Sequence, residues 1–536
     1  MNQRSYADLR EHIKALESHD QLIKISREIN KDTEMHPLVR WQFRGGIKEE
    51  DRKAFLFENV TDSKGKKYDI PVIVGALSAN REIYRLGLGG GDIDLKDINR
   101  IWSRAKTNPI DPKIVEEAPV HEIIIRGPDL EVPGNGLDGI PIPISTPGFD
   151  IAPFTTCSHF ITKDPDSGIQ NMGNYRGQVK SPVRLGMNAS IELGQGIYEH
   201  WKKYQARGEK IPVAVVLGGP PSVAFAAVQK VPHGVDEITI AGGLVGHPIN
   251  IVKCKTVDLF VPAESEIVIE GYINTEWLEP EAPFGESHGH VNLQEYNPFL
   301  EVTAITRRKD AILVSIISQV TPSESSLIKK IAYEASYLEF LRDTIGIKSV
   351  KRVVMHEPLT NLRKLIILQM GEAKEPDIWR ALMATTSLQP ASGKFIIAVD
   401  DDIDPDNLDA VFWAMSYRMK PHADVQIIHG TDGGHGPRAS HGGPYDSVML
   451  MNAMKKEPFP PVSLPTKEFM ENAKEIWEEL NLPPLKPEMP WYGYSLGIWH
   501  EKFQKDAEAA TKSDYFETGK RLVNERRNDI MPNTEL

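Results

Sequence analysis

Residues 213–221 read Val-Ala-Val-Val-Leu-Gly-Gly-Pro-Pro, and this stretch indicates the fold of the middle of the chain. A short apolar run closed by a turn rich in glycine and proline is typical of a buried β-strand. Similar apolar runs occur at residues 123–125 and 267–269, and Pro283-Phe284-Gly285 marks another turn. We therefore predict a mainly β domain, a split barrel, over residues 116–320.

Helices and strands alternate before this region. Leu9, Ile13 and Leu16 recur at helical spacing, and Ser5 is the expected N-cap of that helix. This order predicts an N-terminal α/β domain over residues 1–115. Its expected strands lie at residues 22–25, 54–57 and 71–74.

The same alternation returns after residue 320. A helix is expected at residues 328–341, and strands are expected at residues 350–354 and 395–399. We predict a C-terminal α/β domain with a helical tail over residues 321–536. The whole chain is thus predicted to be a multidomain α+β protein, with the barrel flanked by two α/β domains.

One helix of the tail carries an apolar stripe. Its members share one helical face, and they are Phe469, Ala473, Ile476, Trp477 and Leu480. We expect this face to dock against its own domain, and a contact between subunits is the alternative.

The composition favours small-molecule chemistry. The 536 residues include 75 Asp and Glu against 62 Lys and Arg, a net charge of -13, which disfavours nucleic acid and anionic membrane surfaces as partners. Cys157 and Cys254 are the only cysteines, so one subunit cannot build a disulfide framework, and a reducing cytoplasm is the expected location. No export signal is recognised, and no apolar run approaches the ~20 residues of a membrane span.

Two polar clusters can carry chemistry. Residues 279–290, Glu-Pro-Glu-Ala-Pro-Phe-Gly-Glu-Ser-His-Gly-His, bring three carboxylates and two histidines into one turn between apolar β runs. Residues 170–176, Gln-Asn-Met-Gly-Asn-Tyr-Arg, follow a strand-like run. Alternation places Asn174 and Arg176 on one face and Tyr175 on the other. A solvated surface loop and a structural salt bridge to Arg176 are the respective alternatives.

Three spaced motifs, in this order, resemble those of the UbiD-like decarboxylases, which include ferulic acid decarboxylases and polyprenyl-hydroxybenzoate decarboxylases. The motifs are Asn171-x-x-x-x-Arg176, Pro232-x-Gly234-x-x-Glu237 and Glu281-x-Pro283-Phe284-Gly285-Glu286. The similarity covers most of residues 155–320 and includes the run from Val399 to Asp404. Several motifs in one order are more specific than any one alone.

The resemblance implies a flavin cofactor in the central domain. This cofactor is prenylated FMN, whose phosphate is held partly through a divalent metal, Mn2+ in the first place with Fe2+ or Mg2+ as alternatives, and K+ lies nearby. By position, Asn171 and Glu237 are the implied metal ligands, and an amide oxygen and a carboxylate suit a hard cation. The implied cofactor contacts are Asn171, Met172, Gly173, Asn174, Tyr175, Arg176 and Glu237.

The chain departs from the family pattern at one metal ligand. Relatives usually supply a further histidine there, but residues 184–196 contain none. Asn188, Glu192 or water is expected to take its place. Lys394 is a candidate for the lysine that contacts the phosphate in some relatives.

Decarboxylation needs an electron sink, because no side chain can accept the electrons of the carbanion. The resemblance implies that the prenylated flavin forms a covalent adduct with the substrate, after which CO2 leaves and a proton replaces it. Arg176 would hold the substrate carboxylate or polarise the adduct. Glu281 would orient Arg176, and Glu286 would donate the proton.

The implied function is a reversible, non-oxidative decarboxylation of an aromatic or α,β-unsaturated carboxylic acid. A flavin prenyltransferase would supply the cofactor, and the C-terminal domain would assemble a homodimer or hexamer. Residues 430–438 correspond to a pocket wall that is more apolar in ferulate-type enzymes, but here they are glycine-rich and polar. We therefore expect a polar aromatic acid, such as a hydroxylated or polycarboxylated arene or an aromatic thioester. A surface loop unrelated to the substrate is the alternative.

Three other functions compete with this one. A metal-dependent hydrolase could use His288 and His290 with Glu281 or Glu286, since His-x-His on a strand can bind one metal, but it leaves Asn171 and Arg176 unexplained. A nicotinamide site at Gly87-Leu88-Gly89-Gly90-Gly91 lacks the strand that must precede the glycines. The third possibility is a scaffold without catalysis.

Overall fold

The computed structural model describes residues 7–89, 93, 98–188, 196–229, 231, 234–360, 363–389, 391–434, 443, 445–487, 496–528 and 531–532. They divide into two units. The first draws on Met1–Leu368, Ala373–Ile397 and Gln426–Met451, and the second on Gln369–Glu372, Ala398–Val425 and Asn452–Leu536. The candidate site and the polar networks discussed below lie in the first unit.

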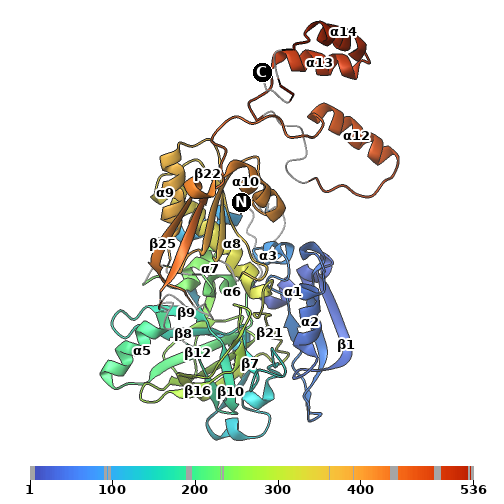
Figure 1. Ribbon diagram of the computed structural model, residues 1–536. Helices are drawn as coiled ribbons and strands as arrows, with labels where there is room; N and C mark the ends of the chain where they lie inside the picture. The colour runs from blue at the N-terminus through green and yellow to red at the C-terminus, as the bar shows by residue number, and fades with distance from the viewer. Residues whose placement is uncertain are drawn as a thin grey trace. The chain divides into compact units, whose positions relative to one another are not determined.

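The first unit contains a nine-stranded sheet, whose green strands lie in the lower part of Figure 1. Its order is β7-β10-β11-β20-β15-β12-β8-β9, and β6 pairs with β20. The strand predicted from the apolar run that begins at Val213 is confirmed as β12, which pairs antiparallel with β15 and with β8. The strands are β6 Ile123–Arg126, β7 Phe154–Thr155, β8 His159–Lys163, β9 Gln170–Asn174, β10 Gly177–Ser181, β11 Arg184–Gly186, β12 Ile211–Leu217, β15 Ile267–Ile273 and β20 Phe299–Arg307.

The sheet curls into a half-barrel. β9 is the last strand at one end of the order, and β10 is the second strand from the other end. Only Tyr175 and Arg176 connect them, and three Cα steps span at most about 11 Å. The two ends of the sheet must therefore approach each other at Arg176, as they do in a barrel that is nearly closed. The predicted split barrel is confirmed.

Smaller elements surround the half-barrel. A three-stranded sheet has the order β14-β13-β5, and two hairpins pair β16 with β19 and β17 with β18. The strands are β5 Lys113–Ile114, β13 Asn250–Lys253, β14 Phe260–Pro262, β16 Glu279–Glu281, β17 Phe284–Gly285, β18 Val291–Asn292 and β19 Glu295–Asn297. The helices are α5 Gly196–Arg207, α6 Pro221–Ala227 and α7 Glu237–Val245.

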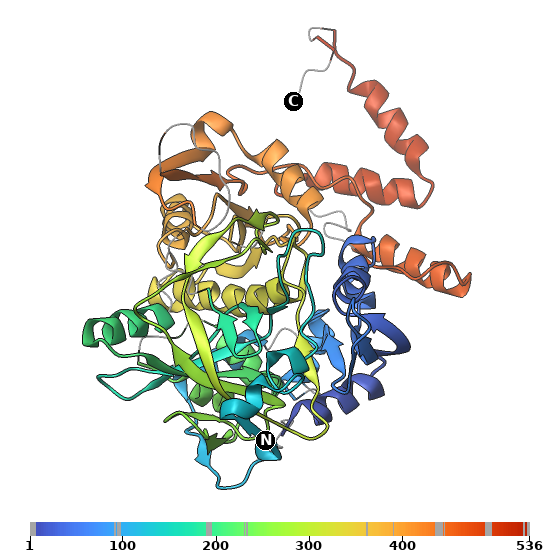
Figure 2. The ribbon, with the colours of Figure 1, turned by 90° about the horizontal axis from the view of Figure 1, so that it is seen from below.

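The N-terminal sheet has the order β1-β2-β4-β21, with β3 beside β2. The three predicted strands are confirmed, but the fourth, β21, comes from residues 313–315 and pairs parallel with β4. Figure 2 shows the blue elements of this region, which come from the N-terminal part of the chain, beside the green strands of the half-barrel. The elements are α1 Leu9–Ser18, β1 Leu22–Asn30, α2 Met35–Arg44, β2 Ala54–Thr61, β3 Lys67–Tyr68, β4 Val72–Val74, α3 Arg81–Gly87, α4 Ile98–Thr107 and β21 Leu313–Ser315.

The first helix begins later than expected. Its N-cap is Asp8, whose carboxylate accepts hydrogen bonds from the backbone N–H groups of Arg10 and Glu11. The prediction of Ser5 as the cap was therefore wrong, and Ser5 itself lies outside the described residues. The apolar face was predicted correctly, since Leu9 and Leu16 are fully buried.

The C-terminal sheet has the order β22-β23-β24-β26-β25. The expected helix and both expected strands are confirmed, although α8 begins four residues earlier than predicted. The elements are α8 Glu324–Glu339, β22 Val350–Met355, β23 Leu365–Met370, α9 Glu375–Thr385, β24 Phe395–Asp400, α10 Leu408–Arg418, α11 Pro421–Asp424, β25 Val425–Thr431 and β26 Asp446–Asn452. Among the described residues, no helix is both long and apolar enough to cross a bilayer.

The tail contains α12 Lys467–Glu479, α13 Glu501–Thr511 and α14 Tyr515–Asn524. No residue of α12 is buried, and Ile476 on its apolar face is 48% exposed. The expected docking of this face against its own domain was therefore wrong. The amphipathic pattern specifies a face, but it does not specify the surface that covers the face.

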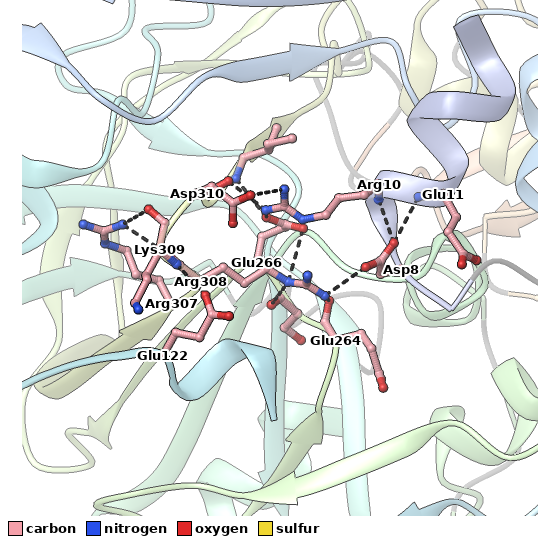
Figure 3. A network of polar contacts seen from close by, with 12 residues as sticks. Asp8, Arg10, Glu11, Glu122, Glu264, Glu266, Arg307, Arg308, Lys309 and Asp310 are labelled. Carbon is pink, nitrogen blue, oxygen red and sulfur yellow. Dashed lines mark hydrogen bonds and ion pairs between the residues drawn. The ribbon is translucent and has the colours of Figure 1, made fainter. Parts of the chain in front are cut away.

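A buried ion-pair network joins α1 to the end of β20 (Figure 3). Glu266, whose side chain is fully buried, lies 3.0 Å from Arg10 Nη2 and 3.6 Å from Arg308 Nε. Arg308 Nη2 also lies 3.1 Å from Asp8, and Arg10 Nη1 lies 2.7 Å from Asp310. Burial raises the pKa of Glu266, so its ionised form depends on these two guanidinium groups.

We expect Glu266→Ala to lower the free energy of unfolding by about 3–5 kcal/mol, because two largely buried cations would lose their shared partner. Denaturant unfolding followed by tryptophan fluorescence measures this change. The control is Glu122→Ala, which removes only an exposed hydrogen bond to the backbone of Lys309. Equal effects of the two substitutions would contradict the role of Glu266.

Candidate functional site

Arg176 lies where the ends of the half-barrel meet, and two carboxylates hold it. Its Nε and Nη2 each donate to one oxygen of Glu281, both at 2.7 Å. Its Nη1 forms an ion pair with Glu286. The side chain of Glu281 is fully buried, and that of Arg176 is 8% exposed. The bidentate geometry fixes the plane of the guanidinium, because two parallel N–H···O bonds leave it little freedom to rotate.

A tight turn positions Glu286. Its backbone N–H donates to the carbonyl of His290 at 3.0 Å, and its carbonyl accepts from the N–H of Gly289 at 3.1 Å. Gly289 has a φ of 91°, a conformation that glycine adopts without strain. The turn joins β17 to β18, so the Glu286 side chain is presented from a paired hairpin.

Three further residues, to which the sequence analysis assigned no role, complete this cluster. Asn297 Nδ2 donates to Glu281 at 3.2 Å, and the ring of Phe284 lies 5.1 Å from the guanidinium carbon of Arg176. Asp150 accepts from the backbone N–H of Gly285 at 2.8 Å. Phe284 stood inside a quoted motif, but Asn297 meets Glu281 only through the β16–β19 pairing, which no local pattern reveals.

A second polar cluster surrounds Glu237 at the start of α7. One of its oxygens accepts the backbone N–H of Met172 at 2.7 Å. Burial, and then the neighbouring Asp236, raises the pKa of Glu237 to about 8 against the lowering effect of that N–H. A buried carboxyl of this kind is easily ionised only when a cation lies beside it. It is thus chemically suited to bind a metal ion.

Asn171 faces the start of α5. A Cβ on Gly196 would lie 2.8 Å from Asn171 Cγ and closer still to its Oδ1. Any side chain at position 196 would overlap the Asn171 amide, so only glycine leaves room for it in this position. The next residue along β9, Met172, donates its backbone N–H to Glu237, so Asn171 and Glu237 belong to the same part of the fold.

The rest of the motif lines the same strand. Tyr175 is buried and packs edge-on against Phe160, with ring centroids 5.9 Å apart, and burial raises its pKa. A Cβ on Gly173 would lie 2.6 Å from this ring. Asn174 Nδ2 donates to the carbonyl of Thr156 at 3.2 Å. Because Gly173 has no side chain, the ring of Tyr175 can pack directly against the backbone of the strand at that residue.

Other residues singled out from the sequence lie elsewhere. Glu279 pairs with Lys180 and Arg184, at 2.8 and 2.9 Å, and does not contact Arg176. Lys394 forms an ion pair with Asp446 at 2.8 Å. Two residues were considered as substitutes for the missing histidine. The backbone N–H of Asn188 donates to the carbonyl of Arg176 at 3.4 Å, whereas Glu192 lies outside the described residues. So do Pro232, Gly90, Gly91 and residues 435–438.

The hydrolase alternative gains no support. The rings of His288 and His290 are 6.0 Å apart. Among the residues that the structure describes, no three His, Cys, Asp or Glu side chains form a group that could hold a metal. Glu281 and Glu286 are instead committed to Arg176. The nicotinamide alternative also fails, because α3 and not a strand precedes its glycines.

Three family models match the chain in order. Each is described as a domain of 3-octaprenyl-4-hydroxybenzoate carboxy-lyase: the N-terminal domain over residues 13–102, the Rift-related domain over residues 113–320 and the C-terminal domain over residues 326–453. The candidate site lies within the second match.

Solved structures agree with these matches. The UbiD-class enzyme HmfF from Pelotomaculum thermopropionicum, in an evolved dimeric form in complex with prenylated FMN (prFMN), is 30% identical, with 86% of this chain and 97% of that chain covered and a TM-score of 0.74. The closed vanillic acid decarboxylase of Sedimentibacter hydroxybenzoicus is 25% identical, with 89% and 99% covered and a TM-score of 0.74. The 3,4-dihydroxybenzoic acid decarboxylase of Klebsiella pneumoniae, at 23% identity, 87% and 99% covered and a TM-score of 0.72, supports the fold alone.

We expect the contribution of Glu237 to the stability of the cofactor-free protein to fall as pH rises from 6 to 8. Its pKa is about 8 in the folded chain and 4.5 as the ordinary value, so in this range the folded state keeps a proton that the unfolded state has lost. Unfolding then releases a proton, and a higher pH favours it by up to about 1.4 kcal/mol per pH unit.

Glu237→Gln should remove this contribution, so that the variant loses less stability, or gains more, between pH 6 and pH 8 than the unchanged protein, because an amide has no proton to lose. Thermal unfolding midpoints at pH 6, 7 and 8 measure the difference from the unchanged protein. Glu199→Gln, on the partly exposed surface of α5, is the matched control. Identical pH profiles for Glu237→Gln and the unchanged chain would show that the pKa of Glu237 is not raised in the folded protein.

Proposed function

Because the chain belongs to the UbiD family of prFMN-dependent decarboxylases, we propose that it removes CO2 from a polar aromatic acid through Arg176, Glu281 and Glu286. The family assigns a carboxy-lyase acting on aromatic or unsaturated acids. The observation that carries the residue roles is the single buried guanidinium shared by two carboxylates.

Arg176 binds the acid in this proposal. A guanidinium has five N–H donors, and Glu281 takes Nε and one N–H of Nη2. The N–H groups of Nη1 and the second N–H of Nη2 remain, and Nη1 faces Glu286. A substrate carboxylate would therefore bind to the guanidinium on the side of Glu286. Glu281 is a positioning residue, because it acts on the substrate through Arg176.

Glu286 supplies the proton that replaces CO2. Its turn is tied to β17 and β18 and anchored through Gly285 to Asp150, so its side chain can exchange Arg176 for the substrate without movement of the sheet. When bound, prFMN would supply the electron sink that decarboxylation requires. The ring of Phe284 covers one face of the Arg176 guanidinium. Water has little access to this group, since the Arg176 side chain is 8% exposed.

Asn171 and Glu237 would hold the divalent cation beside the cofactor phosphate. The fit rests on the donor set, an amide oxygen with a carboxyl whose buried state calls for a cation, and on the space that Gly196 leaves for Asn171. Mn2+ is the proposed metal, with Fe2+ or Mg2+ as alternatives and K+ nearby. The remaining ligands would be water or side chains outside these two residues.

The proposed setting follows the same logic. A flavin prenyltransferase would supply the cofactor, and the two free, buried thiols of Cys157 and Cys254 suit a reducing cytoplasm. A homo-oligomer is proposed, since HmfF has been solved in a dimeric form. Decarboxylation is the proposed direction, with carboxylation favoured at high CO2.

Glu286→Gln should abolish the proton step and leave the binding residues in place. We expect kcat to fall by about 10²–10⁴-fold, with an unchanged visible spectrum of the cofactor in protein produced together with a flavin prenyltransferase. CO2 release from an aromatic acid panel measures the rate. The control is Glu279→Gln, because Glu279 belongs to the same loop but pairs away from Arg176. Full activity of Glu286→Gln would exclude it as the proton donor.

Gly196→Ala should weaken metal binding, because the new methyl group must displace the Asn171 amide. We expect the Mn2+ affinity to fall about tenfold or more, measured by calorimetry on the purified protein. Gly519→Ala is the control, since a Cβ there meets nothing within 4 Å. Unchanged Mn2+ affinity in Gly196→Ala would remove Asn171 from the proposed ligand set.

A further inference from the structure

One face of α8 carries polar side chains at one-turn intervals. Ser325, Lys329 and Tyr333 follow each other at i, i+4 and i+8, so they point to the same side of the helix. Ser325 Oγ donates to Ser318 Oγ at 2.9 Å. At the other end, the guanidinium of Arg363 lies over the ring of Tyr333, 5.4 Å from its centroid. Lys329 and Arg363 thus flank one surface of the helix.

Neither cation has an anionic partner among the residues that the structure describes. Lys329 forms no hydrogen bond or ion pair with any of them, and Arg363 Nη1 donates only to the neutral amide of Gln389, at 2.7 Å. Burial, and then the like charge of Arg363, lowers the pKa of Lys329 to about 8. Its neighbour Lys330, in contrast, lies 3.7 Å from Glu334. The side chains of Lys329 and Arg363 are both partly exposed, so water can solvate them, but two like charges placed this close favour the binding of an anion between them.

This surface lies close to the decarboxylation residues. Gln319 Cγ would be 3.1 Å from a Cβ on Gly285, and Val320 Cγ2 would be 3.5 Å from a Cβ on Gly289. These two glycines flank Glu286, so the segment from Ser318 to Val320 bridges the Glu286 turn and Ser325. Lys329 is one turn further along, about 6 Å by helical rise. An aromatic ring attached to a carboxylate at Arg176 could therefore extend toward Lys329.

We propose that Lys329 and Arg363 form a second anion subsite that binds a remote carboxylate of the substrate. The inference rests on the proposed function and narrows its substrate class to aromatic acids with two carboxylates. An ammonium and a planar guanidinium provide charge-assisted hydrogen bonds to such a group. The subsite orients the ring, so that only the other carboxylate meets Arg176. The phosphate of the cofactor is the alternative anion that Lys329 and Arg363 would bind.

The test compares benzene-1,3- and benzene-1,4-dicarboxylate with their monoamides, which keep the shape and lose one charge. Calorimetry on prFMN-loaded protein measures binding, CO2 release measures turnover, and the visible spectrum measures cofactor occupancy. We expect the unchanged protein to bind at least one diacid about tenfold more tightly than its monoamide, which is the size of one charge-assisted hydrogen bond. Lys329→Met and Arg363→Gln should each remove this preference and leave occupancy unchanged.

Lys330→Met is the matched control, because it removes an adjacent cation that already has a partner; it should keep the preference. The proposal is overturned if the unchanged protein does not prefer a diacid, if Lys329→Met retains the preference, or if Lys329→Met weakens diacid and monoamide equally. A loss of cofactor occupancy with the preference intact would assign the anion to the cofactor phosphate and also overturn it. If no acid releases CO2, the proposed function fails, but the binding ratios still decide the subsite.

Discussion

The fold and the candidate site depend on one constraint, the pairing of Arg176 where the half-barrel nearly closes. The chain passes from β9 to β10 in two residues, and one of them is a guanidinium with little access to solvent. Such a group is very costly without an anion. Glu281 provides that anion from β16, on a separate hairpin. The pairing of β16 with β19 therefore places the carboxylate that stabilises the buried charge of Arg176. The contact between Glu281 and Arg176 ties the β16–β19 hairpin to the half-barrel and fixes the orientation of the guanidinium.

Local sequence patterns predicted much of this arrangement. Apolar runs bounded by glycine and proline gave the positions of β12 and β15, because burial on both faces leaves a continuous apolar segment. The motif residues from Asn171 to Arg176 are adjacent in the chain, so their placement on and after one strand followed directly. Glu281 and Glu286 were picked out by resemblance and spacing, and the structure brings both to Arg176. Their chemical roles stay predictions.

Pairings between distant segments were beyond these patterns. β21 joins the N-terminal sheet from more than 200 residues away, and nothing in its three apolar residues names that partner. Glu279 and Glu281 are two residues apart and of one type, yet the first pairs with Lys180 and the second with Arg176. Residues i and i+2 of a strand point to the same side, so alternation along β16 does not separate them, and the difference depends on which distant segment lies beside each end of the strand. Asn297 and the pair formed by Lys329 and Arg363 escaped for the same reason.

The group around Arg176 carries two carboxylates against one guanidinium, a net charge of minus one, in a place with little solvent. A substrate that arrived as a bare anion would raise this to minus two. Like charges this close repel each other, so electrostatics favours the uptake of a proton together with each acid that binds. Binding and protonation become linked equilibria, and the measured heat of binding would vary with the ionisation enthalpy of the buffer. A proton from solvent would then enter the site together with the substrate, before CO2 leaves and a proton takes its place.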